Sequence, residues 1–213
     1  MKDCSLRVGH LYPDHMNLYG DRGNLMAFVY RAGLRGITVE VEQLQPGDPV
    51  ARGRYDFFFF GGGQDNEQEQ IYEDFLSRKG QDLARELDDG AACLAVCGGY
   101  QLLGRSYEVY GGKKIPGLGW MDVWTEAGST RAIGNILIES TLDGRVVELA
   151  GFENHGGRTF LGEGVTPLGR VVIGSGNNGQ DGTEGALVKS VVGTYLHGPV
   201  LPKNSALTDW LLA

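Results

Sequence analysis

The chain has 213 residues, 41% of them hydrophobic, which predicts a single globular domain over residues 1–213 with a substantial core. Its net charge of −8 argues against a nucleic-acid-binding protein, which would need a basic face. No apolar run approaches the ~20 residues of a membrane span, and the first residues lack the apolar segment of a secretory signal. We therefore expect a cytoplasmic protein without membrane insertion.

The first half of the chain predicts alternating strands and helices. Strands are expected at 6–11, 37–44, 57–60 and 91–96, and helices at 24–32, 67–79 and 81–89. Residues 37–44 alternate between apolar and acidic side chains, whereas 57–60 are four phenylalanines, which is typical of a central strand covered on both faces. This order predicts an α/β fold with a mostly parallel sheet flanked by helices.

The second half predicts short strands separated by glycine turns. These strands are expected at 133–139, 146–149, 171–174, 186–188 and 191–196, followed by a helix at 204–212. With no linker in the chain, we expect these strands to extend or flank the same sheet.

A cysteine ends the apolar run at 91–96 and is followed directly by Gly98 and Gly99. This pattern predicts a sharp turn from a buried strand into a helix, with Cys97 at its apex. A helix N-terminus lowers the pKa of a thiol, and its N–H groups can bind the oxyanion of a tetrahedral intermediate. We therefore interpret Cys97 as a nucleophile; the alternative is a buried structural cysteine, which suits Cys93 inside the run.

The three cysteines also bear on metal binding and redox state. Cys93 and Cys97 are four residues apart and no second pair exists, so no metal site is predicted. Reduced thiols in the cytoplasm are the simplest account.

Three glycines, residues 61–63, follow the 57–60 strand. The carboxyl ends of parallel strands meet at one edge of a sheet, so this loop should approach Cys97. The N–H groups of Gly62 and Gly63 could then complete an oxyanion hole with that of Gly98, although a flexible turn is the simpler alternative. The chain contains no phosphate-loop motif, and so offers no ATP site.

His197 ends an apolar strand at the same predicted edge, and is interpreted as the base that takes and returns the thiol proton. His155 is the rival, since it lies near Glu153 in the sequence. The alternative for His155 is a loop histidine that is hydrogen-bonded for structure.

Residues 97–101 (Cys-Gly-Gly-Tyr-Gln) and 194–199 (Thr-Tyr-Leu-His-Gly-Pro) resemble the class I glutamine amidotransferases of the CobB/CobQ type. Three longer segments, 17–24, 152–159 and 196–204, resemble the GatD-type glutaminase subunits of lipid II isoglutaminyl synthases, and the similarity runs over essentially the whole chain. This resemblance implies a flavodoxin-like α/β fold with extra short strands in the C-terminal half.

The resemblance also implies a division of labour within a heterodimer. This chain would hydrolyse glutamine to glutamate and ammonia without a cofactor of its own. A MurT-like Mur-ligase subunit would hold ATP and Mg, and would use the ammonia to convert the D-glutamate of the lipid II stem peptide to D-isoglutamine in peptidoglycan synthesis. Cys97 would attack the glutamine amide and His197 would protonate the departing ammonia.

Two residues are expected to bind the glutamine substrate. Gln101 matches a position that lines the glutamine pocket in the wider family, although it could be a solvated helix residue. Arg131 would grip the α-carboxylate, which suits a planar guanidinium. The alternatives are a solvated Arg131, or Arg158 in its place.

The chain departs from the family pattern beside the catalytic histidine. Many class I members place a glutamate two residues after it, where this chain has Pro199. The orienting acid would then come from Glu153, from Glu184 or from the synthetase subunit, and we expect the last.

Three other functions remain open from the sequence. They are a glutaminase subunit serving another, cobyrinate-like acceptor, a non-catalytic regulatory module that kept the fold, and a stand-alone cysteine hydrolase. The paired glycine loops with Cys97 and His197 argue against the regulatory module.

Overall fold

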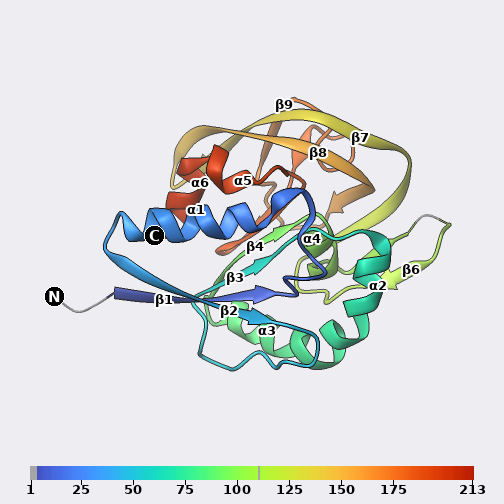
Figure 1. The fold of residues 1–213 in the computed structure, drawn as a ribbon. Coiled ribbons are helices and arrows are strands. Elements are labelled where there is room, and N and C mark those ends of the chain that lie inside the picture. Colours follow the sequence, from blue (N-terminus) through green and yellow to red (C-terminus); the bar gives the residue numbers. More distant parts are fainter. Residues whose placement is uncertain (1–3, 110) are drawn as a thin grey trace.

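The computed structural model describes residues 4–109 and 111–213, and its first sheet carries the strands predicted for the first half of the chain (Figure 1). The strand order is β2-β1-β3-β4-β12-β11, parallel throughout except between β12 and β11. The strands are β1 (Cys4–Leu11), β2 (Ile37–Leu44), β3 (Phe57–Phe60), β4 (Ala92–Val96), β11 (Ala186–Val188) and β12 (Val191–Thr194).

The register of the central strands brings their carboxyl ends to one edge. Phe60 pairs with Leu11 on one side and Ala95 on the other, and Thr194 pairs with Val96. All four β3 phenylalanines are buried, which confirms the predicted central strand. The loops that follow β3, β4 and β12 therefore start side by side.

Helices cover both faces of this sheet. Figure 1 shows α1 (Arg22–Gly33), α5 (Val200–Lys203) and α6 (Ser205–Leu211) on one face, and α2 (Asp65–Asp74) and α3 (Gly80–Asp88) on the other. A π-helical turn (Phe75–Lys79) joins α2 to α3, so the two helices expected at 67–79 and 81–89 are continuous. Among the described residues, no helix is both long enough and apolar enough to cross a bilayer.

Most of the later strands form a second sheet, which corrects the expectation that they extend the first. Only β11 and β12 join the first sheet. The second contains β5 (Ser106–Glu108), β6 (Lys114–Pro116), β7 (Val123–Leu142), β8 (Arg145–Leu161), β9 (Gly169–Ile173) and β10 (Thr183–Glu184).

The long antiparallel hairpin of β7 and β8 arches over the first sheet in Figure 1, with a register shift between Ala127 and Ala132. Only short pieces of it, at 133–139 and 146–149, were predicted. The inward positions of β8 beyond Leu149 include Glu153, His155 and Thr159, so the strand continues where the apolar pattern stops. Hydrophobic periodicity cannot detect a strand whose buried face is polar.

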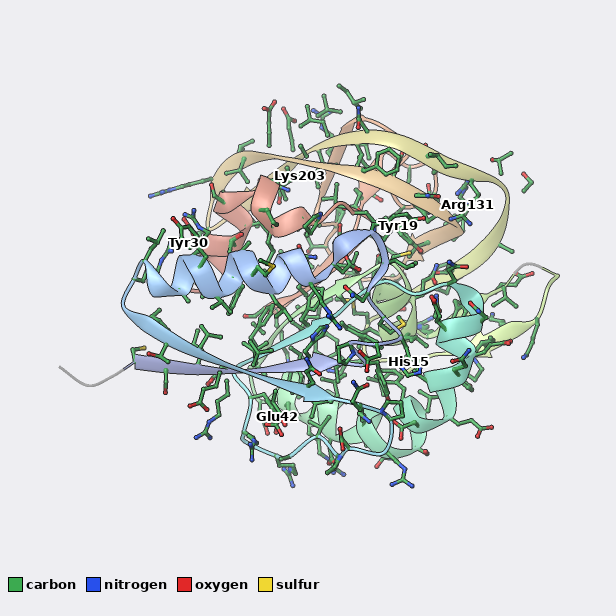
Figure 2. All side chains as sticks on the ribbon, in the orientation of Figure 1. His15, Tyr19, Tyr30, Glu42, Arg131 and Lys203 are labelled. Atoms are coloured by element: carbon green, nitrogen blue, oxygen red, sulfur yellow. The ribbon has the colours of Figure 1, made fainter. Side chains whose placement is uncertain are left out.

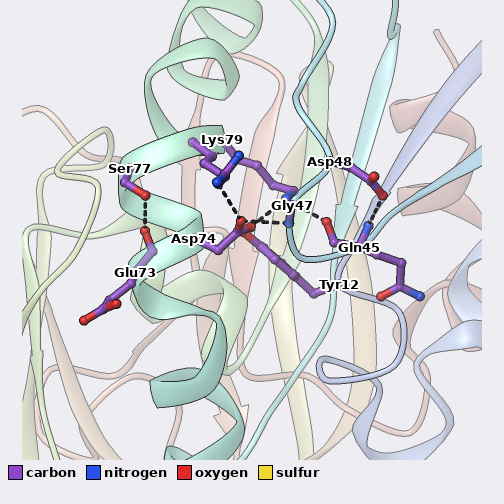
Figure 3. Close-up of polar contacts among 9 residues, drawn as sticks. Tyr12, Gln45, Gly47, Asp48, Glu73, Asp74, Ser77 and Lys79 are labelled. Atoms are coloured by element: carbon purple, nitrogen blue, oxygen red, sulfur yellow. Dashed lines mark hydrogen bonds and ion pairs between the residues drawn. The ribbon is translucent and has the colours of Figure 1, made fainter.

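A buried ion pair fastens the loop after β1 to the end of α2 (Figure 3). The Asp74 carboxylate accepts hydrogen bonds from Lys79 Nζ at 2.6 Å, Tyr12 Oη at 2.8 Å and the Gly47 N–H at 2.8 Å. Lys79 Nζ also donates to the Gln45 carbonyl at 2.8 Å and lies 4.6 Å from the centre of the Tyr12 ring. Tyr12 is thereby fixed at the base of the loop that leads to the 3₁₀ turn η1 (Leu18–Gly20).

Candidate active site

Cys97 stands at the turn between β4 and α4 (Gly98–Leu103), as the sequence predicts. Its backbone has φ 50° and ψ −104°, a combination that L-residues rarely adopt. The Cys97 N–H donates to the Thr194 carbonyl at 2.8 Å, and the Gly99 N–H donates to the Gly61 carbonyl at 3.2 Å. A side chain on Gly99 would lie 2.5 Å from the Phe60 carbonyl oxygen, so only glycine fits there.

The other cysteine in this region has a different environment. Cys93 is fully buried within β4, and burial raises the pKa of its thiol far above the ordinary value. Cys97 instead lines a cavity with a volume of about 750 Å³. The thiol of Cys97 is therefore the one that a substrate in this cavity would meet.

The glycine loop after β3 lies against Cys97, but one of its N–H groups already donates a hydrogen bond within the protein. The Gly62 N–H donates to Asp21 Oδ2 at 2.7 Å, so in this conformation Gly62 is not available as the oxyanion donor that the sequence predicts. The N–H groups of Gly63 and Gly98 donate to none of the described residues. Both glycines pack against the Met16 side chain, and they are the remaining pair for an oxyanion hole.

Asp21 was not singled out from the sequence. Its carboxyl group is fully buried, and burial raises its pKa to about 7, although the hydrogen bond from Gly62 opposes the shift. A Cβ atom placed on Gly62 would lie 3.3 Å from Asp21 Oδ2, 3.2 Å from His197 Cε1 and 3.5 Å from Cys97 Cβ. Gly62 thus lies at the point where these three side chains converge, so a larger residue here would press against all three.

His197 follows β12 and is held by reciprocal backbone hydrogen bonds with Phe152 of β8, at 2.8 and 3.1 Å. The ring of Tyr19 meets it edge-on, with the ring centres 4.9 Å apart. Burial lowers the pKa of His197 to about 4, so the imidazole is neutral at pH 7 and can accept a proton. Neither of its ring nitrogens has a hydrogen-bond partner among the described residues.

His155, the alternative candidate for the base, belongs to strand β8 of the hairpin. His155 Nδ1 is 2.9 Å from the Gly157 carbonyl oxygen, and its ring stacks on Tyr195 with the centres 3.8 Å apart. Burial lowers its pKa to about 4 as well. His155 also lines the cavity, but its ring is anchored by β8, whereas His197 lies beside Gly62 and Cys97.

The two acids considered as orienting groups for His197 are hydrogen-bonded to other residues. The Glu153 carboxylate accepts hydrogen bonds from the N–H groups of Ser175 and Gly176. The Glu184 carboxylate accepts one from the Tyr195 N–H at 2.6 Å. Within the part of the chain that the structure describes, no carboxylate is hydrogen-bonded to His197.

Of the two candidate arginines, Arg131 lines the cavity. Its guanidinium donates to the Asn154 side chain and carbonyl at 2.9–3.1 Å, and Asn154 Nδ2 in turn donates to Tyr19 Oη at 2.7 Å. Figure 2 shows Tyr19, from η1, and Arg131, from β7, approaching from different elements on the same side of the molecule. Arg158 instead donates to the carbonyl oxygens of Thr130 and Gly157.

Gln101 is buried in α4 and lines the cavity, which excludes the solvated-helix alternative. Its Nε2 donates to Tyr195 Oη at 3.1 Å, and its Oε1 accepts from Gln68 Nε2 at 3.2 Å. Gln68, like Asp21, is a residue that sequence reasoning missed. Its one sequence signal is that a glutamine occupies the same face of α2 as the buried Ile71, where an apolar residue is expected.

The sequence matches the family described as the CobB/CobQ-like glutamine amidotransferase domain over residues 7–205. It is 44% identical to the GatD subunit of lipid II isoglutaminyl synthase (glutamine-hydrolyzing) from Staphylococcus aureus, covering 97% of this chain and 83% of that protein. The same subunit from Streptococcus pneumoniae is 42% identical, covering 95% of this chain and 77% of that protein. A cobyric acid synthase from Pelotomaculum thermopropionicum is 35% identical, with 75% and 32% coverage respectively.

The fold agrees with that of solved glutamine amidotransferases. A structure of PurLQS from Thermotoga maritima superposes with a TM-score of 0.65 at 15% identity, covering 97% of each chain. A second structure, described as a glutamine amidotransferase, gives 0.61 at 18% identity and covers 96% of each. Taken with the cysteine and the histidine that follow the adjacent strands β4 and β12, the sequence match establishes that the chain belongs to the CobB/CobQ-like glutamine amidotransferase family.

Proposed function

We propose that this chain is the glutaminase subunit of a lipid II isoglutaminyl synthase, hydrolysing glutamine to glutamate and ammonia. The observation that carries the proposal is the placement of Cys97 and His197 after the adjacent strands β4 and β12, in a chain 44% and 42% identical to two GatD subunits. A cobyrinate-like acceptor has weaker support, because the cobyric acid synthase match is more distant and spans 32% of that protein.

The proposed reaction follows from the chemistry of these groups. The neutral His197 imidazole takes the proton of the Cys97 thiol, and the thiolate attacks the side-chain carbonyl carbon of glutamine. The oxyanion that forms accepts hydrogen bonds from the N–H groups of Gly98 and Gly63. His197 returns the proton to the leaving nitrogen, ammonia departs, and water then releases glutamate from the thioester.

The glutamine substrate would lie in the cavity between α4 and the hairpin. We assign Arg131 to its α-carboxylate, because a guanidinium forms paired hydrogen bonds with a carboxylate and Asn154 already fixes its plane. Gln101 lies at the nucleophile end, one helical turn after Cys97, and borders the side-chain amide.

The partner in this proposal is a MurT-like Mur-ligase subunit that forms a heterodimer with this chain in the cytoplasm. ATP and Mg would be bound by that subunit, which would use the ammonia to amidate the D-glutamate of the lipid II stem peptide. We also propose that this subunit supplies the carboxylate that orients His197. Pro199 occupies the position where many class I members have the orienting glutamate, and the Glu153 and Glu184 carboxylates accept hydrogen bonds from Ser175 and Tyr195 instead.

Reconstitution with a MurT-like subunit tests the proposal. The complex should amidate lipid II with glutamine as the nitrogen source, and the Cys97→Ala complex should do so only with added ammonia. The isolated chain should be a slow glutaminase that the partner stimulates. A partner that assembles with the chain but gives no amidation from glutamine would contradict the proposal.

A further inference from the structure

Asp21 is a buried carboxyl group with few interactions to offset its burial. The side chain is fully buried, and burial raises its pKa to about 7 against the opposing hydrogen bond from the Gly62 N–H. Asn24 Nδ2 lies 3.5 Å from its other oxygen, at the limit of a hydrogen bond. Burying a carboxyl group without an ion-pair partner is unfavourable, so folding alone would favour a less polar side chain here. This cost points to a role for Asp21 in the site.

The backbone of Gly62 is held on both sides by the segment that contains Asp21. The Gly62 N–H donates to Asp21 Oδ2 at 2.7 Å, and the Gly62 carbonyl accepts from the Leu18 N–H at 3.1 Å. The peptide between Gly62 and Gly63 is trans, so the Gly63 N–H points to the side opposite Leu18. These two hydrogen bonds therefore fix the direction of the Gly63 N–H, which donates to none of the described residues.

Both partners of Gly62 come from one short turn. The Asp21 N–H donates to the Leu18 carbonyl at 3.1 Å, which closes the 3₁₀ turn η1 and holds the Leu18 N–H and the Asp21 carboxyl group together. A glycine has wide freedom in φ and ψ, so nothing within Gly62 itself fixes its conformation. Without the Asp21 acceptor, the buried Gly62 N–H would be unpaired, and the loop would turn to satisfy it.

We propose that Asp21 is a positioning residue of the oxyanion hole, which holds the Gly62 N–H and thereby keeps the Gly63 N–H in place for the oxyanion. This inference rests on the proposed glutaminase function. The oxyanion exists only after the Cys97 thiolate has attacked the amide, so a misplaced donor slows turnover and leaves glutamine binding nearly unchanged.

The test uses Asp21→Leu, which keeps a similar shape and removes the acceptor, in the assembled complex. It should lower kcat for glutamine hydrolysis roughly tenfold to a hundredfold with KM within about threefold of wild type, since deleting an oxyanion donor outright costs about 10²–10³-fold. Alkylation of Cys97 by iodoacetamide displaces iodide and forms no oxyanion. Its rate, followed by mass spectrometry of the Cys97 peptide, should stay within about threefold of wild type.

Two further variants separate the acceptor from the charge and from the turn. Asp21→Asn keeps an acceptor oxygen without the charge, and should restore kcat to within about fivefold of wild type. Asp14→Leu is the control, because Asp14 is an exposed carboxylate that precedes the same turn, and it should leave both rates unchanged. If Asp21→Leu does not fold, Asp21→Ala, which also lacks an acceptor, replaces it.

Three results would overturn the inference. Equal losses in hydrolysis and alkylation would show that Asp21 supports Cys97 or the fold as a whole. Equal losses in Asp21→Asn and Asp21→Leu would assign the effect to the charge. An unchanged or higher kcat in Asp21→Leu would show that the Gly62 hydrogen bond is dispensable or withholds a donor from the oxyanion. Absence of glutaminase activity in the wild-type complex would instead count against the proposed function.

Discussion

The ion pair between Asp74 and Lys79 offers a direct test of how the loop that carries Tyr19 is held. The Lys79 side chain is completely buried, and that of Asp74 is 15% exposed. Replacing Asp74 with Asn removes the charge that neutralises Lys79, while the amide oxygen can still accept one hydrogen bond. The buried ammonium then keeps the Gln45 carbonyl, the Tyr12 ring and at most one neutral amide oxygen as favourable contacts.

Removing one partner of a buried ion pair typically costs about 3–5 kcal/mol, because the other charge is left uncompensated. Since Asn retains one acceptor, we expect the lower end, about 3 kcal/mol in the free energy of unfolding. For a chain of this length that corresponds to a fall in Tm of about 6–12 °C. Glu69→Gln on the same helix is the control, since its pair with Lys113 is exposed and should contribute less than about 1 kcal/mol.

Urea denaturation at pH 7, followed by circular dichroism, measures the change in the free energy of unfolding for Asp74→Asn and for Glu69→Gln. Burial raises the pKa of Asp74, but hydrogen bonds from Lys79, Tyr12 and Gly47 outweigh it, so the net pKa lies below the ordinary value. The stabilisation is therefore present above the ordinary carboxyl pKa and is lost as the pH falls through the lowered one. Asp74→Asn should abolish that part of the acid sensitivity. A loss no larger than that of Glu69→Gln would refute the reasoning.

Three further predictions concern the catalytic residues. Cys97→Ala should abolish glutamine hydrolysis with the fold intact, whereas Cys93→Ala should remain active; activity assays with circular dichroism check this, and the reverse pattern would move the nucleophile. His197→Ala should lose ~10²–10⁴-fold in kcat, and His155→Ala less, in steady-state assays; the opposite ranking would make His155 the base. Arg131→Ala should raise KM for glutamine while Cys97 alkylation by iodoacetamide keeps its rate; an unchanged KM would exclude the carboxylate contact.

The parts of this site that can be predicted from the sequence are those whose local pattern determines their geometry. Cys97 follows an apolar strand and precedes two glycines, so its turn is specified within a few residues. Asp21 and Gln68 could not be predicted in the same way. Asp21 accepts a hydrogen bond from Gly62, which is 41 positions away in the sequence, and Gln68 donates one to Gln101, which is 33 positions away.

Most of the length of the β7–β8 hairpin was missed for a related reason, although its segments 133–139 and 146–149 were predicted. Its buried face carries Glu153 and His155, whose partners come from other segments of the chain. A pattern of apolar residues reports burial only where the buried residues are apolar. The polar wall of a substrate cavity is therefore the part of the fold that hydrophobic periodicity describes least well.

The backbone of Cys97 has a consequence for how this chain evolves. Holding a residue with a β-carbon at φ 50° and ψ −104° costs about 1–3 kcal/mol, and glycine would adopt the same angles with less strain. Selection for folding alone would thus favour loss of the thiol at this position. In a copy of the gene that is no longer selected for catalysis, residue 97 should drift toward glycine. Such a protein should lose its activity and gain thermal stability. The cysteine should therefore persist only where ammonia release is itself under selection.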